Sequence, residues 1–364
     1  MFRMLGMDYA GRQKRFQQTL NEQKLDGFVV THPANLRYLC GYTGSNGLFL
    51  FLDGKRVFFT DGRYTEQARE EVKSARVVIP GGALVAGAAK FLGNLKAQVG
   101  FEADVTTVAG AMQMKRLAPK GILWKATSGL IMRQRMIKDG EELRLIRQAV
   151  NLGAKAYEEA AQAIRPGASE IEVAGRLEFA ARRAGAEGMS FETIVTAGKR
   201  AALPHGRASA QSIPKRGFVL VDSGVILRGY CSDMTRTVHV GRIGRVERQW
   251  YESVREAQLV GIATVKAGVT AGEVDEAVRS VLRKAKLDKY FAHSTGHGVG
   301  LEIHEPPRLG SKQTERLDPG MVVTIEPGIY LPDKGGIRIE DMVVVTRTGC
   351  EVLTPVTKEL VEVE

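Results

Sequence analysis

Cysteines and long hydrophobic runs are scarce in this sequence. The three cysteines, Cys40, Cys231 and Cys350, are far apart and form no CxxC pattern. Neither a disulfide framework nor a thiolate zinc site is therefore predicted, and each cysteine is interpreted as a small buried side chain in a reducing compartment. No stretch approaches roughly 18 consecutive apolar residues, and residues 1–10 lack a long apolar run. The sequence thus predicts neither a membrane span nor a signal peptide, and we expect a cytoplasmic protein without a membrane partner.

Acidic residues are too few to balance the basic ones, but only in the first part of the chain. The formal net charge is +11, and residues 1–138 carry 21 Lys and Arg against 10 Asp and Glu, whereas the remainder carries 31 of each. The basic residues of the first part are scattered and form no long run. We therefore expect a solvated basic surface rather than a nucleic-acid partner.

The remaining composition is that of an ordinary globular protein, and its length predicts about two domains. Residues 13–125 alternate short apolar strands, at 28–33, 47–53 and 56–61, with helical stretches such as 64–73, which is typical of an α/β domain. The polar and basic segment 129–140 is interpreted as a linker. A helix is predicted from near Asp139 to about Ile164. The expected domains are residues 1–132 and 133–364.

The second part contains an internal repeat at an offset of 101 residues. RPGASEIEVAGRLEFAARRAG, from Arg165, matches KAGVTAGEVDEAVRSVLRKAK, from Lys266. The matched residues include Gly167 with Gly268, Glu172 with Glu273 and Val173 with Val274. Each copy precedes a strand-turn-strand segment, so one helix-helix-hairpin unit is predicted to occur twice about a pseudo-twofold axis.

Each predicted hairpin carries a pair of acids. Asp222 lies five residues before and Asp233 four residues after a turn at residues 227–229, and Glu326 and Glu340 flank a Pro-, Asp- and Gly-rich loop at 332–336. Each pair is therefore expected to lie directly opposite on one face of its hairpin. Like charges placed so destabilise a sheet, and burying them unpaired is costly. The two pairs together predict a site for divalent metal.

A histidine-rich segment supplies the fifth expected ligand. HSTGHGVGLEIHEPP, residues 293–307, holds three of the six histidines, between the second repeat and the last hairpin. Glycines beside His297 would let the backbone approach a site closely. Beside two acid pairs, His297 is predicted to be a metal ligand.

These residues resemble a known family. DSG at Asp222, DMTRT at Asp233, TGHGVGLEIHE at Thr295, TIEPG at Thr324 and GIRIED at Gly336 resemble, in order, the metal-ligand motifs of the M24 metallopeptidases. NLRYLCGYTGSNG and TDGRYTEQA in the first part resemble the creatinase/prolidase N-terminal domain of the aminopeptidase P and prolidase branch. The resemblance implies an α/β (α+β) protein in which such a domain precedes a pita-bread catalytic domain.

The resemblance also implies a ligand set and a cofactor. Asp222, Asp233, His297, Glu326 and Glu340 would hold two divalent ions per subunit, with Asp233 and Glu340 bridging them. Four carboxylates and one imidazole suit Mn²⁺ and allow Co²⁺, Zn²⁺ or Fe²⁺. Two such ions could lower the pKa of a shared water and polarise the scissile carbonyl, and Glu326 would take the proton of the attacking water.

The resemblance also implies roles in substrate binding for three histidines and one arginine. His205 and His304 resemble the histidines that contact the substrate and stabilise the tetrahedral intermediate or the leaving amine. His293 resembles one that lines the proline pocket; for each histidine, a purely structural role is the alternative. Arg338 would either orient Glu340 or the peptide, or form a salt bridge without a catalytic role. Arg200 departs from the family pattern, because many relatives carry Asn there.

The resulting expectation is a dinuclear metallopeptidase, forming a homodimer, that removes an N-terminal residue preceding proline. The alternative within this chemistry is a prolidase restricted to Xaa-Pro dipeptides, which must grip the free carboxylate of its substrate with a cation such as Arg63. An alternative of another class is a non-catalytic pita-bread binding protein. The aminopeptidase-like segments GYTGSNG and DGRYTEQA favour the first interpretation.

Overall fold

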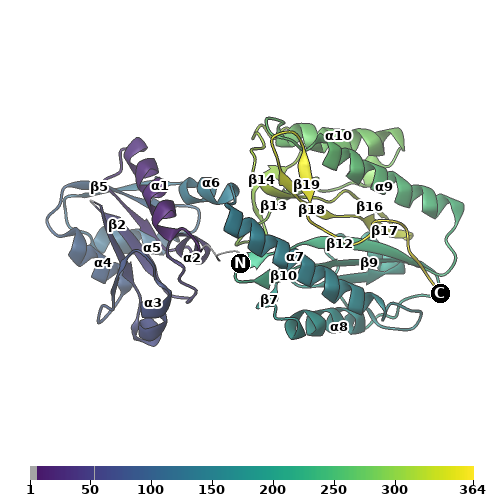
Figure 1. The fold of residues 1–364 in the computed structure, drawn as a ribbon, viewed down its shortest axis with the longest axis horizontal. Helices are drawn as coiled ribbons and strands as arrows, with labels where there is room; N and C mark the ends of the chain where they lie inside the picture. Colours follow the sequence, from purple (N-terminus) through teal and green to yellow (C-terminus); the bar gives the residue numbers. More distant parts are fainter. Residues whose placement is uncertain (1–5, 53) are drawn as a thin grey trace, which may run out of the picture. The chain divides into compact units, whose positions relative to one another are not determined.

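The chain divides into two compact units, Met1–Arg135 and Met136–Glu364, each of which has its own sheets and helices (Figure 1). The structure is a computed structural model that describes residues 6–52 and 54–364. In those residues, no helix combines the length and apolar character needed to cross a bilayer. The domain boundary expected after residue 132 falls inside α6 (Leu130–Met136).

The N-terminal unit is built on one six-stranded mixed sheet in the order β4-β3-β2-β1-β5-β6. Its strands are β1 (Gly27–Val30), β2 (Leu48–Leu52), β3 (Lys55–Phe59), β4 (Arg76–Val78), β5 (Ala97–Glu102) and β6 (Ile122–Thr127). Its helices are α1 (Tyr9–Glu22), α2 (Pro33–Cys40), α3 (Thr65–Glu71), α4 (Leu84–Leu92), α5 (Val108–Leu117) and α6, with a short 3₁₀ turn at Gly62–Tyr64.

Alternation along the strands gives this sheet two apolar faces. Val29 and Leu50 pack with residues of α4 and α5. Phe28 and Phe51, on the opposite face, have ring centroids 5.2 and 5.0 Å from that of Phe16 in α1. Period-two alternation is what a sheet covered by helices on both sides requires, and the α/β domain predicted from the sequence is confirmed.

The linker predicted at residues 129–140 is wrong. Residues 130–136 form α6, which follows Gly129 in a left-handed conformation (φ 69°). Its Ile131 is buried, and the buried Arg135 donates from Nη1 to Oδ1 of Asn35 at 2.8 Å. The basic residues suggested solvent exposure, but at least one of them is an interior hydrogen-bond donor.

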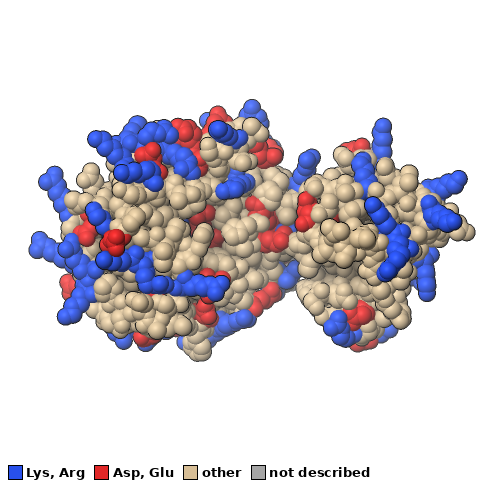
Figure 2. Space-filling model, turned by 180° about the vertical axis from the view of Figure 1, so that it is seen from behind, with Lys and Arg blue, Asp and Glu red and all other residues tan. Residues whose placement is uncertain are grey.

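Lys and Arg side chains are scattered over the visible face of each unit, with Asp and Glu among them (Figure 2). Among the surface arginines of the C-terminal unit, Arg183 is ion-paired with Glu159 and Arg147 with Glu351. The distribution is that of a solvated surface.

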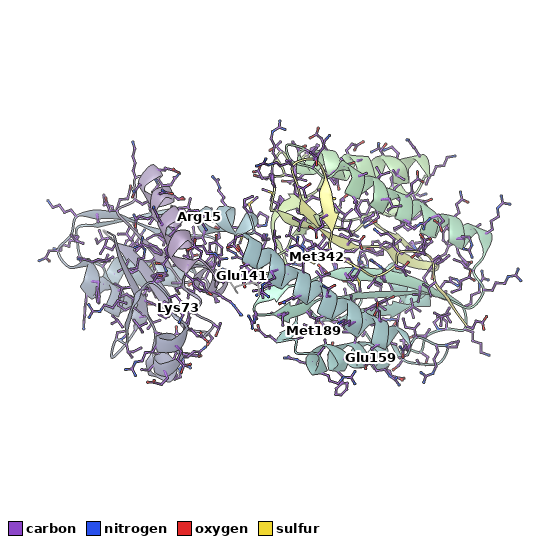
Figure 3. The ribbon with its side chains drawn as sticks, in the orientation of Figure 1. Arg15, Lys73, Glu141, Glu159, Met189 and Met342 are labelled. Carbon is purple, nitrogen blue, oxygen red and sulfur yellow. The ribbon has the colours of Figure 1, made fainter. Side chains whose placement is uncertain are left out.

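The C-terminal unit begins with α7 (Gly140–Ala161), whose first and last turns carry Glu141 and Glu159, labelled in Figure 3. Asp139 caps this helix: its side chain accepts from the N–H groups of Glu141 and Glu142, and the Glu142 side chain accepts from the N–H of Asp139. Such a reciprocal capping box fixes a helix start. The other helices are α8 (Glu170–Arg183), α9 (Arg245–Thr264) and α10 (Ala271–Lys284).

The sheets of this unit lie between the helix pairs α7/α8 and α9/α10 (Figure 1). Two large sheets have the orders β20-β12-β9-β8 and β14-β13-β15-β18-β19, and two small ones are β11-β10-β7 and β16-β17. The strands are β7 (Gly188–Met189), β8 (Ile194–Ala197), β9 (Gly217–Ser223), β10 (Val225–Leu227), β11 (Tyr230–Cys231), β12 (Met234–Val240), β13 (Gly296–Gly298), β14 (Glu305–Leu309), β15 (Val322–Ile325), β16 (Gly328–Leu331), β17 (Gly335–Arg338), β18 (Asp341–Val345), β19 (Cys350–Val352) and β20 (Glu362–Val363).

The internal repeat is visible in the backbone of both halves. Gly167 and Gly268 take nearly the same left-handed conformation, with φ of 86° and 85°. The N–H of Gly167 donates to Ile213 O and that of Gly268 to Leu317 O, at 3.0 and 2.8 Å. Each glycine turns the chain from the first helix of its half into the second, a conformation for which glycine has no steric cost.

The first acid pair is diagonal rather than directly opposite, so the register predicted for it is wrong. Asp222 pairs with Thr235, two residues beyond Asp233. The turn consists of Arg228 and Gly229, both with positive φ (48° and 79°), between Leu227 and Tyr230. Two positive φ angles define a type I′ turn, which is usually signalled by Asn-Gly. This turn centres the hairpin one residue later than the sequence suggested.

The second acid pair follows the predicted register. Ile325 pairs with Asp341 on one side, and Gly328 with Arg338 on the other, so Glu326 and Glu340 fall opposite each other in a continuing register. Both lie where the hairpin passes from one sheet to the other. There the N–H of Glu326 donates to Thr295 O, and that of Glu340 to Thr235 O, at 2.8 and 3.1 Å.

Candidate metal centre

A cavity of about 960 Å³ opens in the C-terminal unit, between the two large sheets. It is lined by all the expected metal ligands and by the other residues to which the family resemblance assigned a role: His205, Asp222, Asp233, His293, His297, His304, Glu326, Arg338 and Glu340. Residues more than a hundred positions apart in the sequence are therefore brought together at one site.

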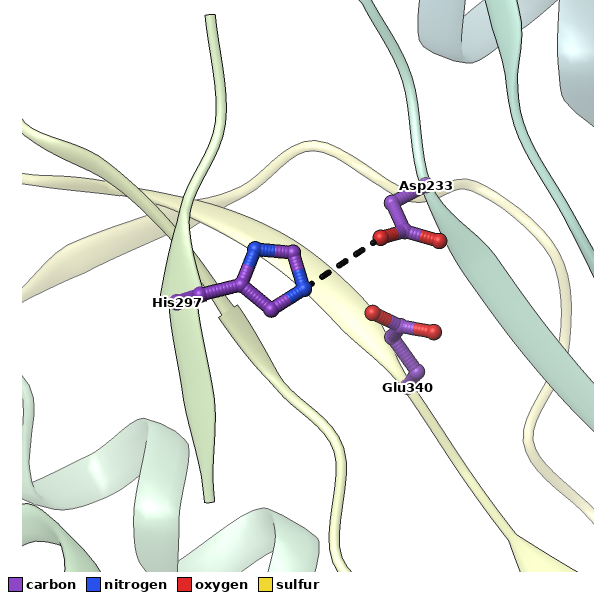
Figure 4. A group of neighbouring side chains, drawn as sticks. All are labelled: Asp233, His297 and Glu340. Carbon is purple, nitrogen blue, oxygen red and sulfur yellow. Dashed lines mark ion pairs between the residues drawn. The ribbon is translucent and has the colours of Figure 1, made fainter. Parts of the chain in front are cut away.

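Three of the side chains that line the cavity lie close together. Ligand atoms of Asp233, His297 and Glu340 all lie within 4.8 Å of one another (Figure 4). Nε2 of His297 is 3.6 Å from Oδ2 of Asp233 and 3.4 Å from Oε1 of Glu326. The residues come from β13, from the start of β12 and from the junctions beside β15 and β18, so each hairpin contributes.

The imidazole of His297 is held in the tautomer that a metal ligand needs. Its Nδ1 lies 3.0 Å from the carbonyl oxygen of Gly298, which can only accept, so Nδ1 carries the proton. Burial lowers the pKa of His297 to about 4, and Nε2 therefore presents a lone pair to the carboxylates. A Cβ at Gly296 would lie 1.9 Å from Thr324 O, which explains why glycine precedes this histidine.

Several carboxylate oxygens of the site are buried and have unused acceptor capacity. Oδ1 of Asp222, Oδ1 of Asp233 and Oε1 of Glu340 are buried without a hydrogen-bond partner among the residues described. Burial, followed by mutual repulsion, holds the pKa values of Asp233 and Glu340 well above their usual range, and burial raises the pKa of Glu326 to about 8. Buried oxygens of this kind are costly unless a cation satisfies them. Four hard oxygen donors and one imidazole fit divalent metal.

Arg338 links the two hairpins. Its Nη2 donates to Oδ2 of Asp222 at 2.6 Å, and its Nε donates to Oγ1 of Thr235 at 3.0 Å. The Thr235 hydroxyl in turn donates to Oε2 of Glu340 at 2.7 Å. The sequence placed Arg338 beside Glu340, but its direct carboxylate partner is Asp222, and it reaches Glu340 only through Thr235.

His293 is fully engaged by the protein. Its Nδ1 lies 2.8 Å from Ser294 O and is therefore the donor, and its Nε2 lies 2.8 Å from the hydroxyl of Tyr330. Burial lowers the pKa of His293 to about 4, so the neutral ring accepts the Tyr330 proton, while the Tyr330 oxygen accepts from Nη1 of Arg338 at 2.6 Å. With both nitrogens occupied, His293 can offer the substrate only its ring surface.

His205 and His304 differ from His293 in this respect. Both are exposed to the cavity, and neither ring has a hydrogen bond within the described chain. The centroid of the His304 ring lies 4.4 Å from that of His297, and burial lowers the pKa of His304. Their nitrogens can therefore donate to or accept from a bound molecule.

Behind the site, a buried network fixes the backbone of the ligands. Arg236 donates to the carbonyl oxygens of Thr235 and Glu340 and, from Nη2, to Oδ1 of Asp341 at 2.7 Å. Met342, labelled in Figure 3, accepts the N–H of Asp233 on its Sδ at 3.1 Å.

Sequence reasoning missed three cavity or network residues. Thr235 follows Asp233 by two positions, so strand alternation could have placed it on the same face. Tyr330 carried no local signal, because its partners lie on other strands. Arg308, on β14, pairs in register with His297 and lines the cavity; its guanidinium has no hydrogen bond or ion pair within the residues described.

Comparison with known proteins agrees with this arrangement. Residues 144–347 match the family described as Metallopeptidase family M24, and residues 12–137 match the Creatinase/Prolidase N-terminal domain. The solved structure of an Xaa-Pro dipeptidase from Bacillus anthracis is 40% identical, with a TM-score of 0.94, covering 98% of this chain and 100% of that one. An Xaa-Pro dipeptidase from Pyrococcus furiosus is 35% identical over 96% of this chain and 99% of its own length.

An X-Pro aminopeptidase from Thermotoga maritima is also similar in structure, at 33% identity and a TM-score of 0.89, covering 96% of this chain and 100% of that one. The prediction of a creatinase/prolidase N-terminal domain followed by a pita-bread domain with an internal repeat is confirmed by these matches. The chain belongs to metallopeptidase family M24.

Proposed function

We propose that this protein is a metal-dependent Xaa-Pro dipeptidase, a prolidase. The sequence favoured the aminopeptidase, but the similar proteins from Bacillus anthracis and Pyrococcus furiosus are both named dipeptidases. The similarity to the Thermotoga maritima aminopeptidase keeps the first expectation as the competing outcome of the test below.

The proposal is supported mainly by the guanidinium of Arg308 in the cavity, which is unpaired among the residues described. A dipeptidase must bind the free carboxylate of its substrate, and Arg308 is a cavity-lining guanidinium with no carboxylate partner of its own in the described chain. The other cavity arginines are already engaged, Arg338 by Asp222 and Arg207 by Glu192. Arg63, the cation considered from sequence, is paired with Asp61. A charge-assisted, bidentate contact to Arg308 would anchor a dipeptide at its C-terminus.

The metal ligands proposed are Asp222, Asp233, His297, Glu326 and Glu340, for two divalent ions, with Mn²⁺ the best match to an oxygen-rich site. When bound, such ions supply a Lewis acid for the scissile carbonyl and lower the pKa of the attacking water. The unpartnered oxygens of Asp222, Asp233 and Glu340 support this set.

Residues of the chain would transfer the proton and bind the substrate. Glu326, whose Oε1 accepts from the Thr324 hydroxyl at 3.1 Å, is oriented to take a proton. His205 and His304 would hydrogen-bond the substrate with their free nitrogens. His293 would form a wall against the proline ring, whose fixed φ suits a shaped pocket.

The proposal is tested by measuring kcat/KM for Xaa-Pro dipeptides, Xaa-Pro-Yaa tripeptides and Xaa-Ala dipeptides after reconstitution with each metal. We expect Xaa-Pro dipeptides to be preferred over the other two sets by about 10- to 100-fold, the value of one charge-assisted contact or of a filled ring pocket. Tripeptides cleaved as well as dipeptides would replace the assignment with an aminopeptidase, and indifference to proline would remove both.

A variant isolates the role of Arg308. Arg308→Met should raise KM for Xaa-Pro by about 10- to 100-fold but leave KM for the Xaa-Pro amide, which lacks the carboxylate, nearly unchanged. Lys312→Met is the matched control, because Lys312 is an exposed cation nearby that does not line the cavity. An equal rise in KM for the Xaa-Pro dipeptide and for its amide would show that Arg308 does not bind the substrate carboxylate.

A further inference from the structure

The segment that carries His205 is anchored by a buried carboxylate. Residues 198–209 leave β8 through a 3₁₀ turn (Gly198–Ala202) and return toward β9. Glu170, the first residue of α8, is fully buried and accepts from the N–H of Ala197 at 2.9 Å, and from the N–H and hydroxyl of Ser209 at 3.1 and 2.6 Å. One carboxylate thus joins the two ends of the segment, at a helix N-terminus that favours its charge.

Arg200 extends this anchor to the residues around His205. Its Nε donates to both oxygens of Glu170, at 3.0 and 3.1 Å, and its Nη2 donates to Arg207 O at 2.7 Å. On the other side of His205, Nη1 of Arg338 donates to Pro204 O at 3.2 Å. His205 therefore sits between two carbonyls that are each held by a guanidinium, although its own ring is free.

The second half of the unit holds its histidine segment in the same way. Asp275 of α10 is buried and accepts from the N–H and hydroxyl of Thr295 at 3.1 and 2.9 Å, and from Nε of Arg279 at 2.8 Å. Arg279 also donates from Nη2 to His293 O at 2.5 Å. At the offset of 101 residues Asp275 corresponds to Ala174, not to Glu170. Both halves thus anchor a histidine segment with a buried carboxylate and an arginine, but these residues do not occupy equivalent positions of the repeat.

We propose that Glu170 and Arg200 are positioning residues that place His205 for the reaction, a proposal that rests on the proposed function. Arg200 uses the fork of its guanidinium to tie Glu170 to the Arg207 carbonyl, and lysine cannot reproduce that geometry. Displacing a substrate-contacting group by about 1 Å can cost about 100-fold in rate. No proposed metal ligand lies on residues 198–209, so the metal content should not depend on this pair.

A double-mutant cycle tests the proposal. Arg200→Met should lower kcat/KM for an Xaa-Pro dipeptide by about 10- to 100-fold in the otherwise unchanged protein, chiefly through kcat, with the metal content retained. In the His205→Ala background the same substitution should have almost no further effect, because Arg200 acts through His205. Arg200→Lys should recover only part of the loss.

Controls keep the result interpretable. Arg176→Met removes an exposed ion pair with Glu172 on the same helix and should leave kcat/KM unchanged. The thermal midpoint of each variant is measured, and Glu170→Gln, which keeps the shape of the anchor, serves as a second variant if Arg200→Met does not fold. Additive losses in the His205→Ala background, or no loss with Arg200→Met, would overturn the proposal. Absence of Xaa-Pro hydrolysis by the unchanged protein would instead overturn the proposed function.

Discussion

Buried carboxylates behave differently in two regions of the C-terminal unit. Outside the cavity lining, Asp341 has donors on both oxygens, Arg236 on Oδ1 and Gln258 and Lys358 on Oδ2, and Glu170 and Asp275 also accept several hydrogen bonds. At the centre, Asp233 and Glu340 keep an oxygen with no partner among the described residues. The chain therefore supplies donors of its own to Asp341, Glu170 and Asp275, but not to these oxygens of Asp233 and Glu340.

This difference indicates what the central acids are for. A protein that can surround Asp341 with cations could have done the same for Asp233, since unsatisfied buried polar groups are rare in native structures. The partner that this arrangement predicts is of a kind that side chains do not supply, a small and multiply charged cation. We therefore expect the central acids to destabilise the metal-free fold, and the acids outside the cavity to stabilise the fold with or without metal.

The largest loss of activity is expected from substitutions of the proposed metal ligands. Asp233→Asn, Glu340→Gln and His297→Ala should each lose bound metal and reduce Xaa-Pro hydrolysis by at least about 1000-fold, because catalysis requires the ions. Elemental analysis and kcat together check this outcome. A variant that keeps its metal and its activity would remove that residue from the ligand set.

The second largest effect should distinguish His205 and His304, whose ring nitrogens are free within the described chain, from His293, whose ring nitrogens are both hydrogen-bonded. His304→Ala and His205→Ala should keep the metal but lower kcat by about 100- to 10,000-fold, the usual scale for a proton-transfer or oxyanion partner. His293→Phe, which keeps a ring against the substrate, should lower kcat less. If His304→Ala empties the site while His297→Ala does not, the roles of these two histidines are exchanged.

Removing the charge of a buried acid should change the free energy of unfolding in opposite directions in the two regions. In metal-free protein, Asp341→Asn leaves the buried Arg236 without its counter-charge and should lower the free energy of unfolding by about 3 to 5 kcal/mol. Asp233→Asn removes an uncompensated carboxylate and should raise it by about 1 to 3 kcal/mol. Urea unfolding after chelation measures both, and destabilisation by Asp233→Asn would contradict the account.

The smallest effect is a dependence on pH. Burial raises the pKa of Glu326 to about 8 in the metal-free fold, above its unfolded value near 4.5. As the pH rises from 4.5 to 8, the unfolded chain therefore binds fewer protons than the native one, and the metal-free protein loses stability. Bound metal keeps this carboxylate ionised, so the gap in Tm between loaded and metal-free protein should widen over this range. A constant gap would show that the carboxylate is not coupled to the metal.

The sequence predicted the members of the site better than their contacts. Ordered motifs placed Asp222, Glu326 and Glu340 in two hairpins, and the Pro-, Asp- and Gly-rich loop at residues 332–336 made the second register predictable. The first register failed because Arg228 adopts a left-handed conformation that its residue type does not signal.

Contacts between the hairpins were beyond sequence reasoning. Arg338 was expected to serve its neighbour Glu340, but its position in the folded sheet brings it to Asp222, 116 residues earlier. Likewise, Arg200 gave no hint of Glu170, since their contact depends on where the 3₁₀ turn meets the start of α8. Such pairings depend on how the two halves pack, which local patterns do not encode.

The central claim is that the unpartnered acids exist to bind divalent ions, and exhaustive chelation tests it most directly. We predict that protein shown by elemental analysis to be metal-free has no activity on Xaa-Pro dipeptides, and that Mn²⁺ restores activity as two ions bind per chain. Full activity in protein with no detectable metal would contradict the account.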